Sequence, residues 1–284
     1  MQPSNSYRYI KTPARLLGCL LLMEYVIFIF SGISFSFLTY DSFFSLPADP
    51  VFGSFFGSGI PQFIISHHWV GLILDILILL LLGAFAYDPL KRWVAITLFV
   101  LLFIFYITLM GYLTHRNYQF GFFLVLIPFL FKKPLNNYYA YEALRYFLLF
   151  FYFSAALLKF INNALVDPAH FSHLLSSQFT VYYLEGKTGF RTDLNLYLIN
   201  HINISYALYI VAFFIELFAL VGFFTKKFDK LIALGLYLFH LTAWLIMDIG
   251  AVGQLSLICL LFLSTALIKD ADNSYRIDFQ LNTN

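Results

Sequence analysis

The feature that most constrains this chain is a series of apolar runs close to 20 residues long, separated by short polar stretches. A helix needs roughly 20 mostly apolar residues to cross the hydrocarbon core of a bilayer. Only helices and closed barrels satisfy their backbone hydrogen bonds in lipid, and long continuous runs of this kind are typical of helices. The sequence therefore predicts an all-α, polytopic integral membrane helical bundle rather than a soluble domain.

The composition points in the same direction. Of the 284 residues, 61% are hydrophobic and only 11% are charged, whereas soluble domains carry about 25% charged residues. The 36 Phe and 20 Tyr residues suit lipid-facing surfaces and the interfacial belts of membrane proteins. A formal net charge of +2 is too small for a nucleic-acid surface. We therefore expect the lipid bilayer as a partner and no nucleic acid.

About eight segments have the length and apolar character of membrane spans. Their bounds are 16–38, 69–87, 93–113, 119–131, 143–164, 203–224, 230–248 and 251–268. The apolar run of the first segment is too long for the core of a signal peptide and has no clear small-residue cleavage site, so we predict a membrane span there. We find no internal repeat and no linker, and we predict a single transmembrane domain over residues 1–284.

Basic residues are distributed unequally between the two sides that eight spans would define. The side opposite the termini has only Arg116, Lys187 and Arg191. The side of the termini has twelve: Arg8, Lys11, Arg15, Lys91, Arg92, Lys132, Lys133, Lys226, Lys227, Lys230, Lys269 and Arg276. Because cytoplasmic loops carry an excess of Lys and Arg, both termini are predicted to be cytoplasmic, with the long loops 39–68 and 165–202 outside.

A small set of charged and polar residues falls at membrane depth. Each costs at least ~2.5–3.5 kcal/mol near the bilayer centre, so each is predicted to face the bundle interior. The set comprises Glu24, Asp75, Arg145, Lys159, Glu216 and His240, with His115 and Asp248 near span ends.

The environment of these residues has more than one interpretation. Lys159 either extends its ammonium group to the outer interface or joins His115, Asp75 and His240 in the outer half of the bundle. His115 is otherwise an ordinary polar residue at a span end. Glu216 and His240 either belong to a functional site or pair structurally, with each other, with Tyr hydroxyls or with Arg145.

Three blocks of the sequence resemble one known family. The segment LRYFLLFFYFSAALLKF (144–160) is similar to the core helix of the vitamin K-dependent gamma-carboxylases and of their bacterial relatives, the HTTM (horizontally transferred transmembrane) proteins. In that helix an Arg precedes a Tyr-Phe-x-Ala-x-x-x-Lys run. Residues 213–250 resemble the family's acidic helix and the Phe-His block that follows it. Residues 69–115 also match without gaps and end at His115.

The resemblance implies roles for the membrane-embedded polar residues. It implies that Lys159 is the catalytic base and that His115 is a second catalytic residue. We assign Arg145, His240, Glu216 and Asp75 to binding of the cofactor, which the resemblance implies to be a reduced, vitamin K-like quinone. The family's Asn-Asn before the His is Leu113-Thr114 here, and its second Lys is Leu158.

The resemblance also implies a small, bacterial-type member without the carboxylases' extracytoplasmic domain, multi-pass in the bacterial inner (cytoplasmic) membrane. No metal is expected, because the only histidine clusters are His67-His68 and His170 with His173, and adjacent histidines rarely chelate one ion.

Three functions remain open at this level. The first is a carboxylase-like, quinol-linked membrane enzyme that modifies a peptide or small substrate at the extracytoplasmic face. The second is a non-catalytic membrane module for maturation, export or binding of a small secreted peptide. The third is a transporter, although the sequence shows no inverted repeat and no matching pair of Gly- or Pro-broken spans.

Overall fold

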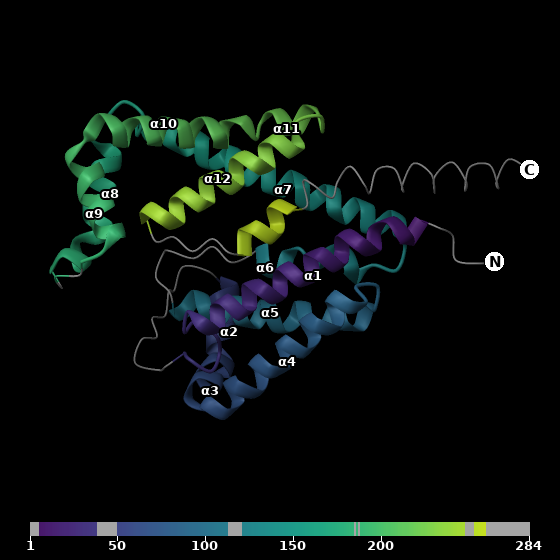
Figure 1. The fold of residues 1–284 in the computed structure, drawn as a ribbon. Coiled ribbons are helices and arrows are strands. Elements are labelled where there is room, and N and C mark those ends of the chain that lie inside the picture. The colour runs from purple at the N-terminus through teal and green to yellow at the C-terminus, as the bar shows by residue number, and fades with distance from the viewer. Residues whose placement is uncertain are drawn as a thin grey trace, which may run out of the picture. The chain divides into compact units, whose positions relative to one another are not determined.

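The computed structural model describes residues 6–38, 50–112, 121–184, 186, 188–247 and 253–259. In these ranges the chain forms helices joined by turns, without a strand (Figure 1). The prediction of an all-α fold is therefore confirmed over this part of the chain. The chain divides into two compact units, Met1–Leu144 with Ala251–Asn284 and Arg145–Gly250, and each is described by itself.

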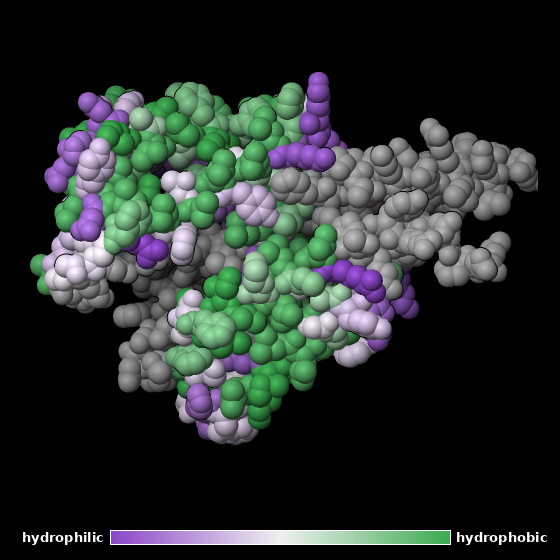
Figure 2. All heavy atoms as spheres, viewed as in Figure 1, coloured by the Kyte–Doolittle hydropathy of each residue, from purple (hydrophilic) through white to green (hydrophobic). Residues whose placement is uncertain are grey.

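Among the described residues, five helical segments are long and apolar enough to cross a membrane. They are α4 (His68–Tyr87), α5 (Arg92–Tyr112), α7 (Pro134–Ile161), α10 (Ile202–Phe218) continued by α11 (Val221–Phe224), and α12 (Asp229–Met247). Their outward-facing side chains are largely apolar, as the space-filling view shows (Figure 2). These helices indicate a multi-pass membrane protein. They correspond to five of the predicted spans, although α7 begins at Pro134 rather than at residue 143.

The fourth predicted span, 119–131, does not form one continuous helix. Its described part consists of α6 (Gly121–Leu124) and the 3₁₀ helix η2 (Ile127–Leu130). Pro128 has no N–H to donate to the carbonyl of Leu124, and its ring clashes with that carbonyl in an α-helix, so the helix ends there. Ten residues are about 15 Å long, half of the hydrocarbon thickness.

The first and last predicted spans differ in their bounds. In place of 16–38, α1 (Ser6–Phe30) starts in the basic N-terminal segment and ends before Gly32, whose φ of 69° leaves the helical region. Of 251–268, residues 253–259 are helical and the others lie outside the described residues. The number of eight spans and the cytoplasmic position of both termini stay predictions.

The first unit is organised around α1. This helix packs against α4, and Gly18 allows a close approach, because a Cβ there would lie 2.7 Å from the Cα of Ala86. Tyr25 and Phe28 pack on the ring of Phe105, at centroid distances of 5.5 and 5.8 Å. The predicted outer loop 39–68 contains two short helices, α2 (Pro50–Gly57) and α3 (Ile60–Ser66).

The second unit contains α7 from Arg145 onwards, α10, α11 and α12, together with a helical hairpin. In this unit α10 runs opposite to α7 and α12 (Figure 1). The hairpin, α8 (His170–Leu184) and α9 (Phe190–Asn200), occupies the predicted outer loop 165–202.

The hairpin caps the end of α12. Arg191 donates hydrogen bonds to the carbonyls of Leu245 and Trp244, and Asn195 donates one to the carbonyl of Ile246. Carbonyls in the last turn of a helix have no partner within the helix. The α9 helix therefore satisfies the C-terminal end of α12 and fixes the two elements against each other.

Candidate active site in the second unit

Lys159 and Glu216 form an ion pair between two membrane-spanning helices. The Nζ of Lys159 on α7 donates to Oε2 of Glu216 on α10 over 2.5 Å. The side chain of Glu216 is 4% exposed and that of Lys159 is 21% exposed. The ammonium of Lys159 is therefore directed at a carboxylate of the same unit, and its depth in the membrane stays a prediction.

The direction of side chains on a helix explains how the two groups meet. Side chains lean toward the N-terminus of their own helix, and α7 and α10 run in opposite directions. Lys159, in the last turn of α7, leans toward the N-terminus of α7. Glu216 leans toward the N-terminus of α10, so the two side chains approach each other. The ammonium is also favoured by the negative end of the α7 dipole, whereas a carboxylate so close to the end of α10 is not. Lys159 therefore compensates a charge that α10 alone would disfavour.

Aromatic rings surround the ammonium group. Nζ of Lys159 lies 5.3 Å from the centroid of the Tyr209 ring and 5.7 Å from that of Phe239. Both distances are within the range of cation–π attraction, which strengthens when water is excluded. The rings therefore stabilise a positive charge at Nζ and form apolar walls beside it.

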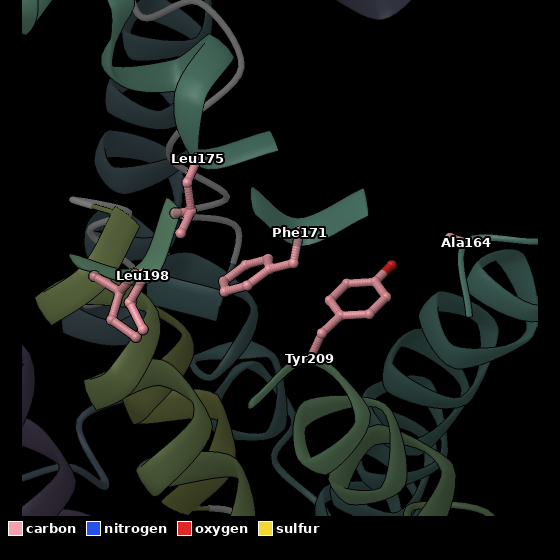
Figure 3. Packing of buried hydrophobic residues seen from close by; sticks show 6 residues of the cluster. Ala164, Phe171, Leu175, Leu198 and Tyr209 are labelled. Atoms are coloured by element: carbon pink, nitrogen blue, oxygen red, sulfur yellow. The ribbon is translucent and has the colours of Figure 1, made fainter. Parts of the chain in front are cut away.

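The α8–α9 hairpin packs against the ring of Tyr209. Figure 3 shows the ring of Phe171 between Tyr209 and the side chains of Leu175 and Leu198. The rings of Phe171 and Tyr209 are stacked, with centroids 5.6 Å apart and an interplanar angle of 24°. This cluster is buried, so Tyr209 is held by the hairpin on one side and contacts Lys159 on the other.

A second polar pair adjoins the first. The hydroxyl of Tyr152 on α7 is hydrogen-bonded to Nε2 of His240 on α12. The ring of Phe239 joins the two pairs, because it contacts the Lys159 ammonium and lies 6.4 Å from the ring of Tyr152. We call the six residues Lys159, Glu216, Tyr152, His240, Tyr209 and Phe239 the Lys159 cluster.

Arg145 lies in a different place in the same unit. Its Nε and Nη2 donate to the two carboxylate oxygens of Asp229, over 2.8 and 2.7 Å, and Nη2 also donates to the carbonyl of Gly222 over 2.6 Å. Arg145 and Asp229 are almost fully buried. This bidentate arrangement joins α7, α11 and α12, and a role of Arg145 in cofactor binding stays a prediction.

Asp75 belongs to the first unit, where it holds the turn after α1. Its carboxylate accepts hydrogen bonds from the hydroxyls of Tyr25 (2.6 Å) and Ser34 (2.8 Å). It also accepts bonds from the backbone N–H groups of Phe35 (3.1 Å) and Ser36 (3.0 Å). Four donors satisfy both oxygens, which is the geometry of a structural anchor. Its assignment to cofactor binding stays a prediction.

His115 lies outside the described residues, so its assignment as a catalytic residue also stays a prediction. Within the described ranges no group of three His, Cys, Asp or Glu side chains is placed to hold a metal ion. His170 instead packs its ring against Tyr209, 5.5 Å between centroids.

The sequence interpretation missed Tyr152, Tyr209 and Phe239. A signal for two of them exists, because Tyr152 precedes Lys159 by seven residues, as Tyr209 precedes Glu216. That spacing is two helical turns and places each pair on one face of its helix. The abundance of Tyr and Phe in lipid-facing positions conceals this signal.

The Lys159 cluster combines an amine, a carboxylate, an imidazole and a phenol within one apolar bundle. Such groups can move a proton between an amine and a carboxylate, or bind a ring that presents a hydroxyl. Searches of known families, of characterised proteins and of solved structures find no match for this chain.

Proposed function

We propose that this chain is a carboxylase-like membrane enzyme, linked to a reduced quinone, that modifies a peptide or small substrate. The observation that carries the proposal is the Lys159–Glu216 ion pair, set among aromatic rings in membrane-spanning helices. Ionisable residues at membrane depth are costly and mark functional sites by default. The resemblance of residues 144–160 to the carboxylase core helix assigns the base to the same lysine.

The predicted orientation supports chemistry at the extracytoplasmic face. The α7 helix is predicted to run outward from the cytoplasm, which puts Lys159, in its last turn, near the outer side. This predicted orientation rests on the unequal distribution of basic residues between the two sides. We therefore propose that the substrate approaches from outside a bacterial inner membrane.

Glu216 gives Lys159 a way to act as a base. A lysine can accept a proton only when its amine is neutral, so the ammonium group must first release a proton. Where water is excluded, as lipid around the helices would exclude it, a charge pair is relieved when its proton moves from the ammonium to the carboxylate. Transfer from Nζ of Lys159 to Oε2 of Glu216 over 2.5 Å would free the amine lone pair. Glu216 then serves as the proton store of the site.

The surroundings of Nζ fit a quinone-like ring. Tyr209 and Phe239 offer flat aromatic faces beside the amine, which suit a planar apolar ring with one ionisable hydroxyl. The Tyr152–His240 pair adds hydrogen-bonding capacity close by. A bound reduced quinone would supply, with oxygen, a base stronger than any side chain of this protein.

The first test compares Lys159→Ala with Leu158→Ala. Leu158 is the neighbouring residue, 56% exposed on the surface of α7, and its truncation leaves the ion pair intact. A candidate secreted peptide is produced together with each variant, and mass spectrometry measures the fraction that carries an added carboxyl group. We expect loss of the modification in Lys159→Ala and its retention in Leu158→Ala.

A double variant separates catalysis from folding. Lys159→Ala leaves Glu216 as a buried unpaired charge, which alone can unfold the bundle. Lys159→Met with Glu216→Leu removes both charges and keeps similar volumes, so the fold is expected to survive. The enzyme proposal requires a folded, inactive double variant.

The alternative of a non-catalytic module has one observation in its favour. The Lys159 ammonium already has a carboxylate partner and two aromatic contacts, as a purely structural ion pair would. On that alternative the folded double variant keeps its full effect on maturation or export of the peptide. Such a result would refute the enzyme proposal.

A further inference from the structure

Glu24 is a buried acid of the first unit, outside the Lys159 cluster. It lies on α1, within the apolar part of the helix, and its exposed fraction is 0%. Oε2 of Glu24 accepts a hydrogen bond from the hydroxyl of Ser256, on the helical segment 253–259. The backbone of Ser256 also bonds to this carboxyl group.

The other oxygen of Glu24 has no partner in the part of the chain that the structure describes. Among the described residues, Oε1 is buried and receives no hydrogen bond. Asp75 provides the comparison within the same unit, because both of its oxygens are bonded, by four donors from the hydroxyl and backbone groups around it. The donors around Asp75 engage both of its oxygens, whereas the donors described around Glu24 leave one oxygen without a bond.

No described cation neutralises Glu24. The described ion pairs that involve Arg145 and Lys159 are both made in the other unit. The basic side chains described on α1 and on the helices packed against it bond elsewhere. Arg15 donates to the carbonyl of Tyr87, Arg92 donates to the carbonyl of Leu130, and His68 bonds to the carbonyl of Ser36.

The remaining titratable groups around α1 do not supply a positive charge. Tyr25 directs its hydroxyl to Asp75. Tyr106 on α5 and Cys259, the titratable residue of 253–259, have side chains with no positively charged form. An isolated carboxylate buried away from water is so costly that it takes up a proton instead.

We propose that Glu24 is a proton-binding site that keeps its carboxyl group protonated at neutral pH inside the first unit. The proton occupies the side of the carboxyl group that Ser256 does not engage. The first unit thereby has a titratable group of its own, independent of the chemistry of Lys159.

Infrared spectroscopy of the full-length protein in lipid nanodiscs tests this proposal directly. A protonated carboxyl group has a carbonyl stretching band that is separate from the bands of ionised carboxylates. We expect this band at neutral pH in the wild-type protein and in Asp75→Asn, and its loss in Glu24→Gln. If Glu24→Gln leaves the spectrum in this region unchanged, the proposal is wrong.

The same spectrum recorded with and without sodium in the buffer gives a second test. If a cation rather than a proton neutralises Glu24, the band will appear only after sodium is removed from the buffer, which would overturn the proposal. Thermal unfolding gives an independent readout. Glu24→Gln replaces a neutral acid by a neutral amide and is expected to unfold at the wild-type temperature, whereas Asp75→Asn is expected to unfold earlier. A large loss of stability in Glu24→Gln would contradict a neutral Glu24.

Discussion

Replacement of Arg145 by methionine tests the packing of the second unit. The methionine side chain is of similar length but lacks the guanidinium group, which donates to Asp229 and to the carbonyl of Gly222. Asp229 has a side-chain exposure of 0%, so its carboxylate would stay buried without this partner. The change therefore removes the guanidinium partner of a buried carboxylate at the junction of α7, α11 and α12.

The size of the effect follows from the burial of both partners. Loss of one member of a buried ion pair costs about 3–5 kcal/mol in the free energy of unfolding. Asp229→Asn removes the carboxylate charge that faces the guanidinium group, which keeps its bond to the carbonyl of Gly222, and is expected to cost a similar amount. The double variant Arg145→Met with Asp229→Leu removes both charges, and replacement of a whole buried pair by apolar residues is often close to neutral. The double variant is therefore expected to be more stable than either single variant.

Reversible unfolding in mixed micelles, driven by sodium dodecyl sulfate and followed by tryptophan fluorescence, measures these free energies. The coupling is the difference between the cost of the double variant and the sum of the two single costs. A cost below about 1 kcal/mol for Arg145→Met would match an exposed pair instead of a buried one. Additive single costs would equally refute the reasoning.

Two glycine substitutions, one in each unit, test close contacts. Gly222→Ala places a Cβ 2.6 Å from Leu149 Cδ2 and is expected to cost about 1–3 kcal/mol of unfolding free energy. The cost of Gly222→Ala should be smaller in a Leu149→Ala background than in the wild-type background, and equal costs in both backgrounds would contradict the contact. Gly71→Ala places a Cβ 2.7 Å from the carbonyl oxygen of Phe35 and should lower the unfolding temperature. Gly83→Ala, with nothing within 4 Å, should stabilise α4 by about 0.5–1 kcal/mol, and equal effects at the two positions would argue against the Phe35 contact.

The apolar runs made the five long helices predictable. In α4, α5, α10–α11 and α12 the run of Leu, Ile, Val and Phe is bounded by charged or polar residues, and the predicted bounds lie within one residue of the observed ones. The α7 helix starts earlier because its first turns contain Asn and Tyr residues that hydropathy does not count as membrane span.

Short-range chemistry explains where the predictions differ from the structure. Pro128 disfavours a continuous α-helix, and an apolar composition alone could not show the break between α6 and η2. The helices α8 and α9 are partly polar, so hydropathy leaves them as loops although their backbones are helical.

The partners of the buried charges depend on tertiary structure. Lys159 and Glu216 are 57 positions apart, and Arg145 and Asp229 are 84 apart. Hydropathy placed Arg145 at membrane depth, but it could not show which acidic residue is the ion-pair partner of Arg145. Asp229, in the first turn of α12, has the position of an ordinary helix-start acid and did not stand out.

The most direct test of the proposed enzyme is its reaction with a reduced quinone. The purified protein in nanodiscs is given a reduced naphthoquinone and oxygen, and absorbance follows quinone formation. We predict oxidation by the wild-type protein, a rate about 10²–10⁴-fold lower in the folded double variant Lys159→Met with Glu216→Leu, and a rate close to wild type in Leu158→Ala. Equal rates in the wild-type protein and this double variant, or no oxidation by the wild-type protein, would contradict the role of Lys159 as the base.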